Sequence, residues 1–427
     1  MLIEFTIGNY KSFKDKVTFS MVAANLSAKD KKLDENNVFA VDGDLTLLKS
    51  AAIYGANASG KSNIAKALTF IKDFIINSSK ETQSTDEINA DNFRLSTETE
   101  NQPSFFELIF LLNRQKYRYG FEVNQSRVIS EWLFYMPLSR EKRLFERNTD
   151  NFKISRIYKA NRIQELTRNN ALFLSVSAQF NVEIAKQILA CLSKQLNIIS
   201  GLEDDTYLGY TLNYLSEEEN KNDVIQLIKK LDIGISGIEV GHIDITSDSL
   251  PDAMSDEVKK LIVESGTKGV LVSTIHKKFD DNGQHLSNEK FYLIEDESEG
   301  TQKVFALAGI LIDTLKNGSV LIFDELDARL HPLLSMAIVQ LFNSNETNPN
   351  NAQLIFMTHD TNLLSNKIFR RDQIWFTEKN KYGATDLYSL AEYKVRNDAS
   401  FENDYIKGKY GAIPYIGNLN TLISTHE

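Results

Sequence analysis

Hydrophobic and polar residues alternate over the first 22 positions of the chain. Apolar side chains recur at every second position of residues 3–7 and 17–21, with the turn 8–11 between them. Because successive side chains of a strand point to opposite faces, this pattern predicts two strands joined as a hairpin. The continuous apolar run at 45–54 is typical of a fully buried strand.

A helical period begins after residue 60. Apolar residues on one helix face predict a helix over 62–76, and the polar stretch 78–103 predicts a loop. Further strands are expected at 105–112, 117–123, 270–279 and 290–295, and further helices at 182–196, 223–231 and 255–263. From 301 to 360 a helix, an apolar strand, a second helix and another apolar strand follow one another. This alternation indicates a parallel sheet with helices on its faces, and so an α/β fold.

Composition limits the class of protein. The 427 residues, 42% hydrophobic and 25% charged, are typical of a globular chain with about two to four compact units. The net charge of -10 argues against a chain that coats nucleic acid through its overall field. A single cysteine, Cys191, excludes an internal disulfide and a cysteine-based zinc site. Without a secretion signal or a run of about 18 apolar residues, we expect a cytoplasmic protein with no membrane contact.

Residues 55–62 carry the first chemical signal. They read Gly-Ala-Asn-Ala-Ser-Gly-Lys-Ser, match the phosphate-loop pattern G-x-x-x-x-G-K-[ST], and lie between a predicted buried strand and a predicted helix. In such a loop, backbone N–H groups surround the β-phosphate, Lys61 reaches the β and γ oxygens, and Ser62 holds Mg²⁺. The expected nucleotide-binding residues are Gly55, Ala56, Asn57, Ala58, Ser59, Gly60, Lys61, Ser62 and Asn63.

A pair of acids ends the apolar strand predicted at 320–323. Asp324 is expected to bind Mg²⁺ together with Ser62, and Glu325 to orient or deprotonate the attacking water. The guanine-reading pattern N-K-x-D occurs at 220–223, but it follows a run of glutamates instead of an apolar strand. ATP is therefore the expected nucleotide.

Two further segments lie in a characteristic order around the acid pair. Ser298 and Gly300 open the helix that precedes it, and His359 ends the apolar strand that follows it. This order resembles that of ABC-type ATPases. The resemblance implies that Ser298, Gly300 and Thr301 reach the γ-phosphate on another subunit, and that His359 senses that phosphate. An acid-rich helix cap and a core histidine are the alternative interpretations of these residues.

Several segments resemble one branch of these ATPases. Lys61 and Asp324 are separated by roughly twice the length that a compact nucleotide-binding domain needs, so a large insertion divides the site. With the start at 3–13, this resembles the RecF, SMC and OLD branch, although no coiled-coil arm is present. Residues 324–332 and the tail segments 370–376, 382–389 and 409–414 resemble the ATPase subunits of bacterial abortive-infection loci, of AbiL type and RloA-like.

The resemblance implies a fold, a domain layout and a role. We expect a P-loop NTPase of ABC type, with a mixed sheet flanked by helices and a mostly helical insertion. Residues 1–139 and 291–427 would form the two halves of the ATPase, and 140–290 an inserted lid domain. The implied role is an ATP-hydrolysing sensor or regulator of phage defence, homodimeric or of higher order, that controls a separate effector such as a nuclease or toxin. A RecF-like DNA-binding repair ATPase is the alternative.

One basic segment leaves a question open. Residues 140–168 contain nine Lys or Arg residues against four acids, interleaved with aromatic residues. This segment is either a solvated face or a contact for nucleic acid or an acidic partner.

Overall fold

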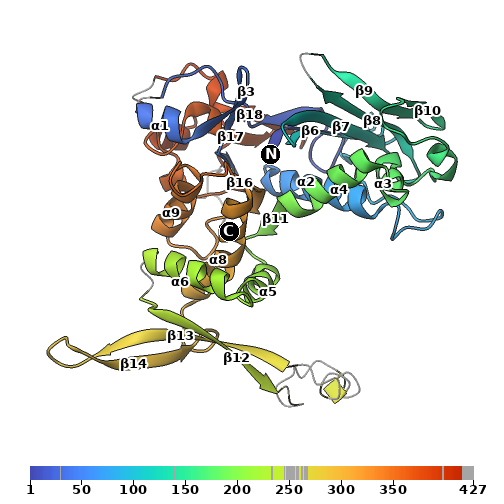
Figure 1. Ribbon diagram of the computed structural model, residues 1–427. Coiled ribbons are helices and arrows are strands. Elements are labelled where there is room, and N and C mark those ends of the chain that lie inside the picture. Colours follow the sequence, from blue (N-terminus) through green and yellow to red (C-terminus); the bar gives the residue numbers. More distant parts are fainter. Residues whose placement is uncertain are drawn as a thin grey trace, which may run out of the picture. The chain divides into compact units, whose positions relative to one another are not determined.

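The computed structural model describes residues 1–28, 30–137, 140–231, 234–244, 246, 255, 259–260, 263, 268–396 and 399–415 (Figure 1). The chain forms two compact units. The first consists of Met1–Leu202, Asp313–Ala328 and Pro332–Glu427, and the second of Glu203–Ile312 and Arg329–His331. Most of the helix expected at 255–263 lies outside the described residues.

The first unit contains a seven-stranded antiparallel sheet, ordered β10-β9-β8-β7-β6-β1-β2. Its strands are β1 (Leu2–Gly8), β2 (Val17–Ser20), β6 (Ser104–Leu112), β7 (Gln115–Val123), β8 (Val128–Met136), β9 (Lys142–Asn148) and β10 (Asn151–Ile154). Strands β1 and β2 pair antiparallel, which confirms the predicted hairpin. The loop expected at 78–103 is also confirmed, since no helix or strand is assigned there.

The second sheet of this unit is ordered β11-β15-β16-β5-β17-β18. It consists of β11 (Leu196–Ser200), β15 (Val320–Asp324), β16 (Gln353–Met357), β5 (Ser50–Gly55), β17 (Ile374–Lys379) and β18 (Thr385–Ser389). All neighbours are parallel except the edge strand β18, which is antiparallel to β17. The parallel sheet predicted from 301–360 is therefore present, and the carboxyl ends of β5, β15 and β16 meet at one edge.

Helix α2 (Lys61–Asn77) carries the hydrophobic core between the two sheets. Its buried face includes Ile64, Leu68 and Ile71, which belong to one cluster with apolar side chains of β1, β5 and β7. Helices α3 (Phe173–Gln179) and α4 (Glu183–Gln195) join the same cluster, and α2 and α4 lie side by side in Figure 1. The remaining elements of this unit are α1 (Lys31–Asn36), β3 (Val38–Asp42), β4 (Leu45–Leu48), α9 (Pro332–Phe342), α10 (Phe401–Ile406) and the short 3-10 helices η1 (Ile163–Leu166), η3 (Thr361–Leu363), η4 (Arg371–Gln373) and η5 (Leu390–Glu392).

The apolar run 45–54 forms two strands, so the prediction of one strand is wrong. Strand β4 pairs with β3, whereas β5 pairs with β16 and β17 in the parallel sheet. The break falls at Lys49, whose N–H donates to Asn37 O and whose C=O accepts from Leu354 N, both at 2.9 Å. Its side chain is fully buried and donates to Asn345, and burial lowers the lysine pKa to about 8.

The second unit contains helices and a small sheet. Among the described residues, its elements are α5 (Asp204–Tyr214), α6 (Glu218–Lys230), β12 (Gly237–Asp244), β13 (Lys268–Phe279), β14 (His285–Tyr292) and most of α8 (Glu299–Asn317). The sheet is antiparallel, ordered β12-β13-β14. Strand β14 begins five residues before the strand expected at 290–295. In the described residues no helix is both long and apolar enough to cross a membrane.

The insertion differs from the expected mostly helical lid. Within 140–290 strands β9 to β13 accompany helices α3 to α6, and the compact units do not follow the expected ranges 1–139, 140–290 and 291–427. The physical reason is strand pairing. Strand β9 pairs with β8 and β11 with β15, so residues up to Leu202 pack with the first unit.

Candidate functional site

The loop after β5 has a tightly packed backbone at both glycines of the predicted phosphate-loop motif. All six residues of β5 are buried, and Gly60 precedes α2 with φ of 113°, in the left-handed region that favours glycine. A Cβ on Gly60 would lie 2.5 Å from Thr385 Oγ1, and one on Gly55 would lie 2.4 Å from Thr377 Oγ1. Both glycines of the motif are therefore fixed by the close approach of β17 and β18.

Hydroxyl groups from distant segments brace this loop. Ser59 Oγ lies 2.7 Å from Thr377 Oγ1, and Thr385 Oγ1 lies 2.8 Å from both Ser59 O and Ser12 Oγ. Asn63 Nδ2 donates to Ser12 Oγ at 2.7 Å. Sequence reasoning missed Ser12, Thr377 and Thr385, because no local motif marks a residue that contacts the loop from more than 45 positions away.

Lys61 lies folded against its own loop. Its Nζ donates to Gly55 O at 2.9 Å and to Ala56 O at 3.1 Å, and the residue is 6% exposed. Burial lowers the lysine pKa to about 8, while the carboxylates of Asp324 and Glu325 act in the opposite direction. A buried ammonium bonded to neutral carbonyls fits an anionic phosphate, which would stabilise its charge.

Ser62 and Asp324 lie together, as the sequence predicts. Ser62 Oγ donates to Asp324 Oδ1 at 3.2 Å, which joins the first turn of α2 to the end of β15. Burial raises the pKa of the Asp324 carboxyl, and the hydrogen bond from Ser62 opposes this shift. A hydroxyl and a carboxylate are hard oxygen ligands, so this pair is of the kind that would hold Mg²⁺.

Glu325 follows Asp324 with a strained backbone. Its φ is 59°, a left-handed conformation that costs a non-glycine residue roughly 1 kcal/mol or more. Gly201 N donates to Asp324 O at 2.7 Å, and a Cβ on Gly201 would lie 2.0 Å from Glu325 O. The close approach of this glycine, which sequence reasoning missed, fixes the peptide that carries the glutamate.

His359 lies beyond the end of β16, at the same edge of the sheet. Its side chain is exposed, and its backbone N–H donates to Asp327 Oδ1 at 3.3 Å. Partial desolvation, with the positive charge of Lys61 as the second cause, lowers the histidine pKa from its usual 6.5. This shift favours the neutral imidazole, which keeps one N–H to donate. Sequence reasoning gave no role to Asp327.

Ser298, Gly300 and Thr301 belong to the second unit and begin helix α8. Ser298 Oγ accepts from Thr301 N at 3.2 Å and lies 2.9 Å from Thr301 Oγ1, so Ser298 caps the helix. Ser298 is exposed. A Cβ on Gly300 would meet no atom closer than the carbonyl oxygen of Arg329, at 3.6 Å.

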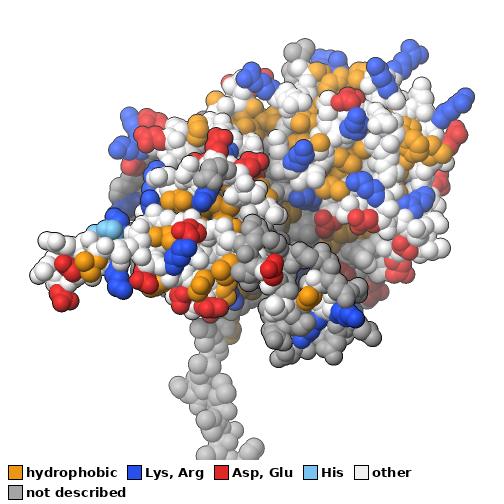
Figure 2. Space-filling model, turned by 60° about the horizontal axis from the view of Figure 1, so that its bottom comes forward, with side chains coloured by type: hydrophobic (Ala, Val, Ile, Leu, Met, Phe, Trp, Pro, Cys, Tyr) orange, Lys and Arg blue, Asp and Glu red, His pale blue; other side chains and the backbone are white. Residues whose placement is uncertain are grey.

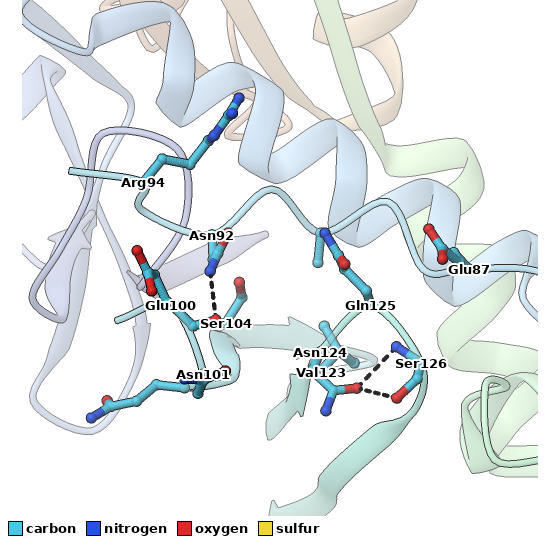
Figure 3. A pocket seen from close by; sticks show the side chains of 12 residues that line it. Glu87, Asn92, Arg94, Glu100, Asn101, Ser104, Val123, Asn124, Gln125 and Ser126 are labelled. Atoms are coloured by element: carbon cyan, nitrogen blue, oxygen red, sulfur yellow. Dashed lines mark hydrogen bonds between the residues drawn. The ribbon is translucent and has the colours of Figure 1, made fainter. Parts of the chain in front are cut away.

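A polar cavity of about 640 Å³ lies within the first unit, between the 87–104 loop and the β7–β8 turn. Figure 3 shows Arg94, Asn92 and Gln125 among its lining side chains. None of the predicted site residues lines it.

The basic segment 140–168 is only partly a surface feature. Arg147 is 3% exposed and donates to the carbonyl oxygens of Thr149 and Ala171, at 2.9 and 2.8 Å. Arg143 is exposed and pairs with Glu146 at 2.9 Å. On the face drawn in Figure 2, Lys and Arg side chains are interspersed with Asp and Glu.

The chain is similar to several solved structures. The SMC head domain from Thermotoga maritima is 13% identical, with 91% of this chain and 98% of that chain covered and a TM-score of 0.41. The recombination mediator protein RecF-ATPrS of the RecFOR pathway is 11% identical over 91% of this chain and 98% of that chain, with a TM-score of 0.34. CbiO1 from Clostridium perfringens, part of the ABC transporter complex CbiONQ, is 11% identical over 96% and 92%, with a TM-score of 0.33.

No curated protein matches the chain significantly. One family model does match, at residues 50–186 and 211–365, which are well over half of the sequence. The matched ranges contain the loop 55–62, the acid pair at the end of β15 and His359, whose geometry is described above. The chain belongs to this family, described as "AAA domain, putative AbiEii toxin, Type IV TA system".

Proposed function

We propose that this chain binds ATP with Mg²⁺ and hydrolyses it to ADP and phosphate. The observation that carries the proposal is the contact of Ser62 Oγ with Asp324 Oδ1, which links residues 262 positions apart. The buried Lys61 beside them supplies the charge for the β- and γ-phosphates. When bound, Mg²⁺ adds positive charge that offsets the charge of those phosphates.

In this proposal each remaining group at the edge of the sheet has a separate task. The Glu325 carboxylate accepts a proton from the attacking water or orients it, and the close approach of Gly201 fixes the backbone that carries it. His359 donates a ring N–H toward the γ-phosphate. The hydroxyls of Ser12, Thr377 and Thr385 hold the loop in the shape that directs its N–H groups at phosphate.

The proposed active form is a homodimer or a higher homo-oligomer. Ser298, Gly300 and Thr301 of one chain complete the phosphate site of the next, and the exposed cap of α8 supports this assignment because a helix N-terminus attracts anions. Each site then needs two chains, so ATP turnover per chain should rise with protein concentration. Turnover that stays constant in a strict monomer would contradict this arrangement.

The biological role that we propose is regulation in cytoplasmic phage defence of abortive-infection type. The family description, which includes a toxin of a toxin–antitoxin system, supports it, as does the resemblance of residues 324–332 to such ATPase subunits. ATP state would control a separate effector, a nuclease or a toxin. The alternative is a RecF-like DNA-binding ATPase, supported by the exposed cations Arg140, Lys142 and Arg156.

A plaque assay tests this role. A host carrying the complete native locus should resist phage, and Lys61→Ala should abolish that resistance. A pull-down of the tagged chain from the same host, read by mass spectrometry, should capture the effector in amounts that differ between the wild type and Lys61→Ala. Full resistance with Lys61→Ala would contradict the role, and ATP-dependent capture of DNA ends without phage resistance would favour the RecF-like alternative.

A further inference from the structure

A hydrogen-bonded cluster in the second unit connects its small sheet to the start of helix α8. Glu297, the residue before Ser298, places its carboxylate against β13. His276 Nε2 lies 2.7 Å from Glu297 Oε1, and Thr274 Oγ1 donates to the same oxygen. The Glu297 side chain is 8% exposed and that of His276 is 21% exposed, so this contact is largely shielded from water.

The register of the sheet explains why these side chains meet. Thr274 and His276 are two residues apart on β13 and therefore point to the same face. Thr274 is paired with Phe291 of β14, whose ring centroid lies 4.6 Å from that of His276. The imidazole therefore contacts both the Phe291 ring and the Glu297 carboxylate.

The backbone of Glu297 is also held. Gln302 Nε2 donates to Glu297 O at 2.9 Å and to Ile294 O at 3.2 Å, so the first turn of α8 is bonded back to the segment that leads into it. Ser298 closes the same turn by capping Thr301 N. Glu297 is therefore the point at which β13 and the first turn of α8 are joined.

We infer that Glu297, held by Thr274 and His276, is a positioning residue that sets the place of Ser298 and Gly300 at the partner's ATP. This inference rests on the proposed function of the α8 N-terminus. Two hydrogen-bonding groups of β13 converge on one carboxylate oxygen of Glu297, which restricts the movement of the residue beside the cap. Transfer of phosphate to water tolerates little misplacement of a contacting group, since a shift of about 1 Å can cost roughly 10²-fold in rate.

Steady-state kinetics give the first test. Glu297→Ala should lower ATP turnover about 10-fold while ATP affinity stays within about twofold, because the chain's own phosphate loop is untouched. Glu297→Gln keeps an acceptor oxygen for Thr274 and should retain more turnover than Glu297→Ala. Thr274→Val should also lower turnover without altering the α8 segment. The matched control is Lys278→Ala, which removes an exposed pair with Glu289 on the same sheet and should change nothing.

Mixing variants separates positioning from a folding defect. Lys61→Ala has an inactive phosphate loop and an intact α8 terminus. In a heterodimer with Glu297→Ala, one site combines an intact phosphate loop with an intact α8 terminus, so turnover should be restored. The reference is a mixture of Lys61→Ala with Ser298→Arg, in which the same site is intact, and the two mixtures should reach the same turnover. Rescue in the Ser298→Arg mixture alone would overturn the role of Glu297 and leave the proposed function standing. Rescue in neither mixture would overturn assembly in trans and this role with it, and wild-type turnover of Glu297→Ala would overturn the inference directly.

Discussion

The buried pair of Arg147 and Glu131 gives a prediction that separates stability from docking in the basic segment. The two side chains are 1% and 0% exposed, with Arg147 Nη1 and Glu131 Oε2 at 3.8 Å. Glu131 also accepts from Tyr119 and from the N–H groups of Phe173 and Leu174, at 2.6 to 3.0 Å. Burial raises the pKa of the Glu131 carboxyl, and the guanidinium of Arg147 works against that shift.

Replacing Arg147 with Ala should destabilise the protein strongly. The change leaves the Glu131 charge buried without its cation, and it removes the donors that Thr149 O and Ala171 O accept from. Breaking such a buried pair costs about 3 to 5 kcal/mol. Arg143→Ala is the control on the same strand, because its pair with Glu146 is 45% and 40% exposed and is worth about 1 kcal/mol or less.

Urea unfolding followed by tryptophan fluorescence measures both variants, since Trp132 lies on β8 beside this pair. Adding Glu131→Gln to Arg147→Ala should recover part of the loss, because the remaining side chain is then neutral. Equal unfolding free energies for Arg147→Ala and Arg143→Ala would refute this reasoning. Charge reversal at Arg147 is consequently no test of partner docking, since it would destabilise the fold of the segment that carries the exposed cations.

Sequence patterns predicted the elements whose causes are local. The hairpin at the start, the helix after Gly60, the strand that ends at Asp324 and the strand that precedes His359 all appear, because a side-chain period or a glycine turn determines each of them nearby. The contact of Ser62 with Asp324 followed from the order of motifs along the chain. The inward side chain of Arg147 also had a local signal, since it lies two residues after the buried Phe145 on one strand.

The missed features depend on contacts between distant segments. Lys49 ends β4 because its N–H and C=O bond to Asn37 and Leu354, and a single apolar run contains no trace of that division. Thr377 braces the phosphate loop from 318 positions away. Gly201 must be a glycine because the carbonyl oxygen of Glu325 lies where a Cβ would be. The spacing of the two residues along the chain does not predict that contact.

Three further predictions concern catalysis, docking and pH. Glu325→Gln should keep ATP affinity and slow turnover roughly 10²-fold in a phosphate-release assay, as the loss of a general base does, and wild-type turnover would refute the assignment. Reversing the exposed Lys142, Lys153 and Arg156 to Glu should abolish binding of an acidic partner or DNA in a pull-down and leave turnover intact; unchanged binding would mark a solvated face. Lys49 has a pKa lowered by burial to about 8, against about 10.4 in an unfolded chain. The unfolded chain therefore binds more protons between these values, and Lys49 makes the free energy of unfolding rise with pH across that window. Lys49→Met removes this contribution. The unfolding free energy of the wild type, minus that of the variant, should therefore increase between pH 8 and pH 10 in urea titrations. A constant difference between the two proteins over that range would show that Lys49 keeps an ordinary pKa and that its burial carries no electrostatic cost.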